Sequence, residues 1–92
     1  MSTPLIFSHP SGVNHTHKSK RNAGVLLRSD DGAKTWHKIA SATPENASVA
    51  FGYSNLNRLP DSGRVGLTYE TTDAGCDEKA DACRIVYRTF EV

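Results

Sequence analysis

The sequence predicts an all-β domain built from antiparallel strands. Helix signals are nearly absent, and short apolar segments of period two are bounded instead by Gly, Pro, Asp and Asn. A length of 92 residues fits one small domain or a piece of a larger one, and a hydrophobic content of 37% predicts a thin core. We therefore expect consecutive hairpins with modest stability of their own.

Five segments of the chain are predicted as strands. In order they are residues 4–8, 25–27, 51–56, 64–69 and 84–90. In the last one, RIVYRTF, both alternating faces are partly apolar, which favours a place inside a stack of sheets over an open edge. The polar loop at 11–20 lies between the first two segments and shows no periodicity.

The segment 52–70 predicts a hairpin with a reactive side chain on each strand. The sequence Pro60-Asp61-Ser62-Gly63 supplies the chain reversal. Tyr53 near the start of one strand and Glu70 at the end of the other would then lie at the same end. A phenol and a carboxylate brought together at one rim of a sheet suggest a site. The simpler interpretation is a tyrosine at a strand rim and a solvated glutamate.

Charge and hydropathy exclude some classes of protein. Eleven Lys and Arg balance ten Asp and Glu, which gives no overall field of the kind that attracts nucleic acid. The longest apolar run is too short to span a bilayer. The first ten residues lack the basic and apolar regions of a secretory signal. Residues 18–21, including Arg21, form a short basic run that could simply be solvated.

Cys76 and Cys83 enclose six residues, which is too long a spacing for a CxxC redox or zinc pair. A local disulfide across a long hairpin loop is the favoured interpretation, with two free thiols as the alternative. A disulfide would indicate an oxidising compartment, and the sequons at Asn14 and Asn46 fit that setting.

The residues His15 and His17 could suggest a metal pair, but no third ligand is evident. A loop without metal is the favoured interpretation. We therefore expect no metal site and no cofactor.

The octapeptide SDDGAKTW, residues 29–36, predicts a tight turn with a large anchor after it. Asp31-Gly32 is a turn dipeptide, and short polar side chains nearby can bond the backbone of the turn. Trp36 can bury under the hairpin. The segment resembles the Asp box, S-x-D-x-G-x-T-W, of sialidase-type propellers, where the box is structural. The matching residues are Ser29, Asp31, Gly32, Thr35 and Trp36, with Ala33 where the motif usually has a second glycine.

Three further segments resemble the last part of a bacterial-type exo-α-sialidase domain, in the same order. FSHPSGVNHTHKSKRNAGVLLRSDDG resembles the stretch that delivers the third arginine of the carboxylate-binding triad, and Arg21 matches it. GYSNL resembles the stretch with the catalytic tyrosine, which matches Tyr53. GLTYE resembles the stretch whose glutamate steadies another arginine, which matches Glu70. The strand CRIVYRTF is similar to the closing strand of the domain.

The resemblance implies a six-bladed β-propeller of antiparallel four-stranded sheets, of which residues 1–92 would form about two C-terminal blades. It implies hydrolysis of terminal sialic acid with retention, through a tyrosine nucleophile. The acid/base aspartate, the glutamate base and two triad arginines of the family have no match in this sequence. The isolated chain is therefore expected to be inactive.

The resemblance also sets the expected surroundings. The partners would be sialylated glycans, once the chain is joined to the rest of a propeller, and the parent protein would be secreted or at the cell surface. Sheet edges and inter-blade faces left open in a piece of a propeller would favour self-association. The alternative from a different class is a non-catalytic Asp-box module that binds glycans or proteins.

Overall fold

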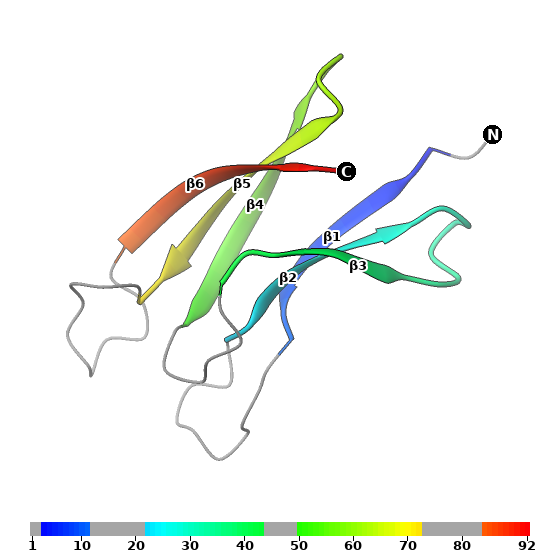
Figure 1. Cartoon of the computed structure of the whole chain (residues 1–92). Helices are drawn as coiled ribbons and strands as arrows, with labels where there is room; N and C mark the ends of the chain where they lie inside the picture. Colours follow the sequence, from blue (N-terminus) through cyan, green and yellow to red (C-terminus); the bar gives the residue numbers. More distant parts are fainter. Residues whose placement is uncertain (1–2, 12–21, 44–49, 73–83) are drawn as a thin grey trace.

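The computed structural model describes residues 3–11, 22–43, 50–72 and 84–92. It confirms an all-β domain and arranges six strands in two three-stranded antiparallel sheets. Figure 1 shows the two sheets as separate groups of strands along the chain. The described part contains no helix long and apolar enough to cross a membrane.

The first sheet consists of β1 (Leu5–Pro10), β2 (Gly24–Ser29) and β3 (His37–Ser41), in that order. β1 pairs with β2 without interruption, from Leu5 opposite Ser29 to Pro10 opposite Gly24. The pairing of β2 with β3 shifts between Leu26 and Leu27. The turn between β2 and β3 is the octapeptide region that the sequence predicted as a tight turn.

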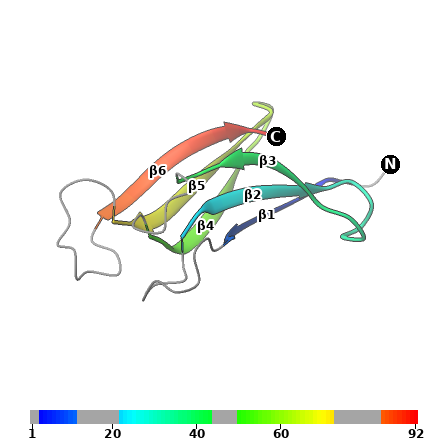
Figure 2. The same ribbon diagram turned by 60° about the horizontal axis from the view of Figure 1, so that its bottom comes forward.

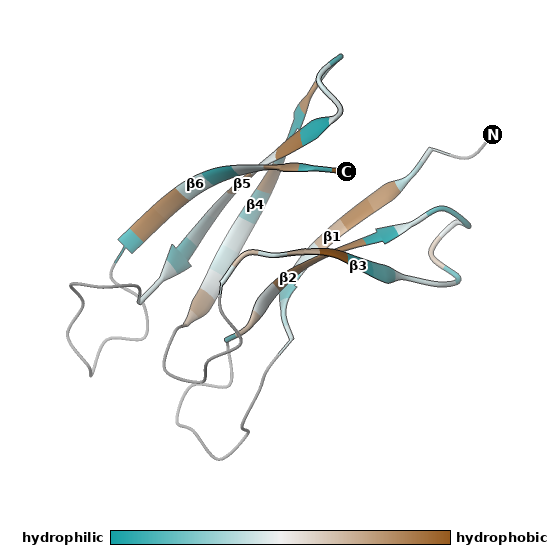
Figure 3. Ribbon diagram, viewed as in Figure 1, coloured by the Kyte–Doolittle hydropathy of each residue, from teal (hydrophilic) through white to brown (hydrophobic). Residues whose placement is uncertain are grey.

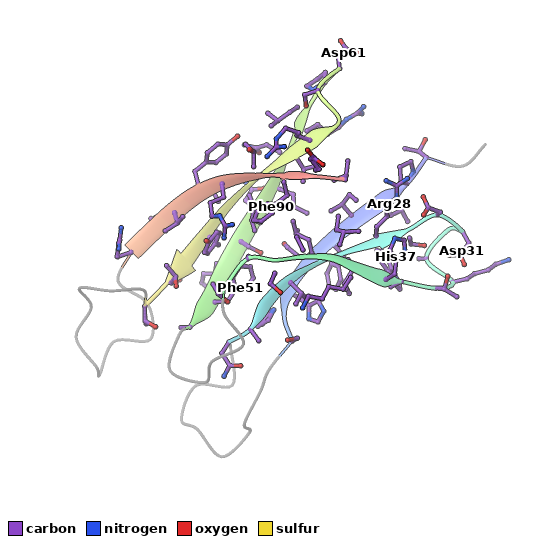
Figure 4. The ribbon with its side chains drawn as sticks, viewed as in Figure 1. Arg28, Asp31, His37, Phe51, Asp61 and Phe90 are labelled. Carbon is purple, nitrogen blue, oxygen red and sulfur yellow. The ribbon has the colours of Figure 1, made fainter. Side chains whose placement is uncertain are left out.

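The second sheet consists of β4 (Phe51–Leu59), β5 (Arg64–Thr71) and β6 (Arg84–Glu91). The predicted reversal at 60–63 joins β4 to β5, and both Asp61 and Gly63 have positive φ angles there, 62° and 69°. Figure 4 shows Asp61 at the tip of this hairpin. β5 is the central strand and is the one most buried.

The core lies between the two sheets. Each sheet turns one face toward the other, and the side chains that meet there are mainly aliphatic and aromatic. The buried members are Leu26, Ala42, Phe51, Leu67, Tyr69 and Phe90. Figures 1 and 2 show the sheets splayed apart at one end, and Figure 4 places Phe51 and Phe90 between them. We call these facing surfaces the inner faces and the opposite surfaces the outer faces.

Polar contacts join the sheets as well. The Tyr69 hydroxyl and the Arg88 guanidinium both donate to the Ala42 carbonyl, at 3.3 and 2.7 Å. The Ser8 and Ser54 hydroxyls bond at 2.8 Å, and this contact holds β1 beside β4. Because these bonds come from residues distant in the sequence, they fix the position of one sheet on the other.

The aromatic ring of Phe51 makes Gly24 a requirement of this packing. A Cβ atom at residue 24 would lie 2.3 Å from the Phe51 Cδ1 atom. Phe51 is fully buried and its ring lies 5.2 Å from the Tyr69 ring, centroid to centroid. The first residue of β2 therefore has to be glycine for the ring to reach the core.

The five predicted strands all form, and the sixth, β3, was not predicted. Its sequence HKIAS has a single large apolar residue, so the period-two signal is weak. The described residues confirm antiparallel sheets but place three strands in each sheet, where four were expected.

The expected place of β6 inside a stack is also wrong in the described part of the chain. β6 is an edge strand, and Ile85 on its outer face is 76% exposed. Figure 3 shows this apolar stretch of β6 at the margin of the molecule. Its inner-face residues, by contrast, reach the core.

Candidate functional site

A β-bulge in β4 determines the geometry around Tyr53. Phe51 pairs with Thr71 and Ser54 pairs with Tyr69, and the register shifts between these two pairs. Two residues of β4, Gly52 and Tyr53, therefore lie opposite the single residue Glu70 of β5. A bulge of this kind bends the strand and redirects a side chain at the edge of a sheet.

The bulge places Tyr53 and Glu70 on the same face. Ser54 faces the first sheet, because its hydroxyl bonds that of Ser8, so alternation puts Tyr53 on the outer face. On β5, Tyr69 belongs to the core, so its neighbour Glu70 also lies on the outer face. The two candidate residues thus lie at one end of the hairpin, as the sequence predicted.

Gly52 allows the glutamate to lie against the bulge. A Cβ atom at residue 52 would be 2.8 Å from the Glu70 Oε2 atom and 3.1 Å from the Glu70 Cβ atom. The Glu70 side chain is half-buried, whereas Tyr53 is 74% exposed. The site therefore has an accessible phenol, and its carboxylate occupies the space that a side chain at residue 52 would fill.

The turn at 29–35 is held by a set of hydrogen bonds around Ser29 and Asp31. The Ser29 hydroxyl donates to Asp31 Oδ1 at 2.8 Å and accepts from the Ala33 N–H at 2.9 Å. Thr35 donates twice to Asp31, through its N–H at 2.9 Å and its hydroxyl at 2.6 Å. These side chains replace backbone bonds that the tight turn cannot make.

Hydrogen bonds within this turn lower the pKa of the Asp31 carboxyl group. Donation from the Thr35 hydroxyl, followed by the Thr35 N–H and the Ser29 hydroxyl, lowers the pKa of Asp31 from 3.8 to about 2. The lowered pKa reflects bonds to the charged form within the turn. Asp31 consequently acts as a structural acceptor, and nothing in its surroundings points to acid or base chemistry.

Trp36 is less covered than the sequence predicted. Its ring lies 5.9 Å from the Phe7 ring, and Phe7 stacks on His9 at 5.1 Å, centroid to centroid. Phe7 alternates with Ile6, which packs against the core, so this aromatic group lies on the outer face of the first sheet. Trp36 packs at the side of the sheet and remains partly exposed.

Several predicted residues lie outside the described ranges. They are Arg21, Cys76 and Cys83, together with His15, His17 and the two sequons at Asn14 and Asn46. Among the residues that are described, no group of three His, Cys, Asp or Glu could hold a metal ion.

A cavity of about 430 Å³ lies at the other end of the hairpin. It is lined by the start of β1 and by residues around the β4–β5 turn, including Ile6, Leu56 and Val65. Neither Tyr53 nor Glu70 lines it. The cavity therefore does not mark Tyr53 and Glu70 as a site. The case for that site depends on the β4 bulge and on the chemistry of the two side chains.

The sequence analysis missed two contributors to this rim. Gly52 gives no signal from sequence, because its role depends on which residue faces it across the bulge. The bond between Ser8 and Ser54 is equally unpredictable, since it joins two sheets.

In comparisons with known proteins, no family model, no curated protein and no solved structure matches this chain.

Proposed function

We propose that the chain is the C-terminal part of an exo-α-sialidase domain and supplies half of its active site. The observation that supports this most is the two-for-one pairing across the β4–β5 bulge. It places a solvent-accessible phenol, Tyr53, and a half-buried carboxylate, Glu70, on one face. The hydrogen-bonded turn at 29–35 adds the Asp-box pattern that precedes this hairpin in the resemblance.

The chemistry of sialic acid favours a tyrosine over a carboxylate as nucleophile. The sugar has a carboxylate on its anomeric carbon, which would repel a second carboxylate but not a neutral phenol. The Tyr53 hydroxyl would give its proton to the glutamate base and its oxygen would form a bond to the anomeric carbon, while the bond to the glycosidic oxygen breaks and that oxygen takes up a proton from the acid/base aspartate. Water, losing a proton to the aspartate, would then attack from the face that the leaving group left and break the tyrosyl–sugar bond, and the Tyr53 oxygen would regain its proton, with net retention.

The remaining roles fall to charged groups. Arg21 would hold the substrate carboxylate bidentately, as planar guanidinium groups do. Glu70 would orient a further arginine, and the acid/base aspartate and the glutamate base would come from sequence beyond this chain. A phenol with an ordinary pKa of about 10 needs such a base at neutral pH. The parent protein would act on secreted or cell-surface glycans.

Two observations test this proposal. The purified 92-residue protein should release no fluorophore from a fluorogenic sialoside, because the base and the acid are absent. Reading the DNA upstream of Met1 should reveal, in frame or after a frameshift, an arginine motif and further Asp boxes. Upstream sequence without these motifs would instead favour a non-catalytic Asp-box module, and turnover by the isolated chain would contradict the assigned division of the site.

A further inference from the structure

The turn between β2 and β3 exposes an aspartate followed directly by a glycine. Asp31 and Gly32 are both exposed to solvent, and Figure 4 shows Asp31 in this loop. No atom lies within 4 Å of the position that a Cβ atom would take at Gly32. Because glycine has no side chain, it hinders least the attack of its own backbone nitrogen on a preceding aspartate side chain. Steric hindrance at Gly32 therefore gives Asp31 little protection against this attack.

The attack converts aspartate to isoaspartate in two steps. The Gly32 nitrogen forms a bond to the Asp31 Cγ atom and gives up its proton, and one protonated oxygen of the carboxyl group leaves as water. Water then adds to one carbonyl of the resulting succinimide ring and breaks that carbonyl's bond to nitrogen. Cleavage at Cγ restores aspartate, whereas cleavage at the main-chain carbonyl leaves a chain that runs through Cγ. One water is released and one is taken up, so no other reactant is needed.

Hydrogen bonds in this turn oppose the first step. Asp31 Oδ1 accepts from the Ser29 hydroxyl at 2.8 Å and from the Thr35 N–H at 2.9 Å, and Oδ2 accepts from the Thr35 hydroxyl at 2.6 Å. Ser29 is buried at the end of β2, which anchors one of these donors to the sheet. Turning the carboxyl group onto the Gly32 nitrogen would break these bonds.

The same bonds also disfavour the chemical form that reacts. The Thr35 hydroxyl, followed by the Thr35 N–H and the Ser29 hydroxyl, lowers the pKa of Asp31 and so keeps the carboxyl group charged. A charged carboxylate has no protonated oxygen that can leave as water. Geometry and charge therefore act in the same direction.

We propose that Asp31 is the isomerisation site of this turn and that the bonds from Ser29 and Thr35 protect it from closing onto Gly32. Isoaspartate at residue 31 would lengthen the backbone of the turn by one atom and move the carboxylate to a different carbon. The three bonds to Ser29 and Thr35 would then be lost in their present form. This inference rests on the turn alone and is independent of the sialidase proposal.

The test compares the wild-type 92-residue protein with Thr35→Val, which removes the hydroxyl donor and keeps the N–H. The folded proteins are incubated in mildly acidic buffer, and isoaspartate at residue 31 is measured by peptide mapping with electron-transfer fragmentation. Because a hydrogen bond to a charged group is lost, we expect isoaspartate to form roughly tenfold faster in Thr35→Val. Thr35→Ser keeps a hydroxyl and should react at close to the wild-type rate.

Three controls separate lost protection from general unfolding. Thr68→Val makes the same substitution within β5, and Gly24→Ala disturbs the packing of Phe51, so both should leave the rate at residue 31 unchanged. Asp61, an exposed turn aspartate followed by Ser62, is an internal reference whose rate should not follow the substitution of Thr35. Wild type unfolded in urea, without the turn bonds, should react at residue 31 at least as fast as Thr35→Val.

Ser29→Ala takes the place of Thr35→Val if circular dichroism shows that Thr35→Val is unfolded. Equal rates at residue 31 in wild type and Thr35→Val would overturn the protective role of these bonds. Equal rates in the folded and the urea-unfolded wild type, or an equal rise in Thr35→Val and in folded Gly24→Ala, would overturn it as well.

Discussion

Ala33 is the residue at which the turn at 29–35 departs from the Asp-box pattern. Its φ angle is 75°, in the left-handed region, and Gly32 before it has a φ angle of 72°. The Ala33 N–H still donates to the Ser29 hydroxyl, so the bonding of the turn survives without the second glycine. The left-handed conformation is strained for alanine because of its Cβ atom.

Replacing this alanine should therefore stabilise the protein. Ala33→Gly relieves about 1–2 kcal/mol of left-handed strain, whereas the greater entropy of the unfolded glycine chain costs roughly 0.4–1 kcal/mol, for a net gain of up to about 1.5 kcal/mol. Urea denaturation measures the change in the free energy of unfolding. The control Ala40→Gly, within β3, should lower stability. A loss of stability in Ala33→Gly would contradict the strain.

The lowered pKa of Asp31 predicts a pH dependence with a definite sign. Because the pKa is lower in the folded state, the charged carboxylate stabilises the fold fully above about pH 4. This contribution disappears as the pH falls toward about 2. The difference in unfolding free energy between the wild type and Asp31→Asn should therefore shrink over that range. A difference that stays constant would contradict a lowered pKa of Asp31 in the folded state.

A second measurement locates the cause in Thr35. In Thr35→Val the hydroxyl that donates to Asp31 is gone, while the N–H bond remains possible. Carboxyl-carbon NMR titration should then show the Asp31 pKa rising toward 3.8. An unchanged pKa would mean that this hydroxyl is not its main cause.

At the scale of elements, the close approach of Phe51 to the start of β2 ties the two sheets together. Gly24→Ala forces a Cβ atom into the Phe51 ring and should cost about 1–3 kcal/mol of unfolding free energy. In a Phe51→Leu background the same substitution should cost less, because the ring is gone. Chemical denaturation of the four proteins of this double-mutant cycle measures the coupling. Additive costs would show that the ring does not contact residue 24.

The strands were predictable where apolar residues alternate clearly. Residues 51–56 and 64–69 have that pattern and a reversal with Pro and Gly between them, so the hairpin was evident. β3 was not, because Ile39 is its one large apolar residue and its partner strand selects the segment. A local sequence pattern cannot predict a strand that forms because it pairs with a neighbouring strand.

The bulge shows the same limit within the candidate site. Tyr53 and Glu70 lie at the same end of the hairpin because one is near the start of β4 and the other near the end of β5. The sequence alone was enough to predict this. That Gly52 and Tyr53 both oppose Glu70 follows from a register shift, which the sequence does not encode locally. The face on which the phenol lies therefore emerged only from the pairing.

At the scale of the whole molecule, two sheets share one core and leave two apolar faces uncovered. The inner-face contacts explain how so thin a core holds together, since the large aromatic residues Phe51, Tyr69 and Phe90 are half of its buried members. A domain of this size buries only a limited part of its surface, so contact with a neighbouring surface at these uncovered faces would add stability. The sequence anticipated the thin core but not which strands would lie at the margins.

The central claim, that Tyr53 is the nucleophile of a half-site completed by other sequence, is tested by one assay. The continuous reading frame around this chain is expressed, and release of a fluorogenic sialoside is compared for wild type, Tyr53→Phe and Tyr87→Phe. Tyr87 is a matched control because it is an exposed tyrosine on the same outer face. We expect turnover by the wild type and Tyr87→Phe and a loss of about a thousandfold or more in Tyr53→Phe. Equal turnover by Tyr53→Phe, or none by the wild type, would contradict the claim.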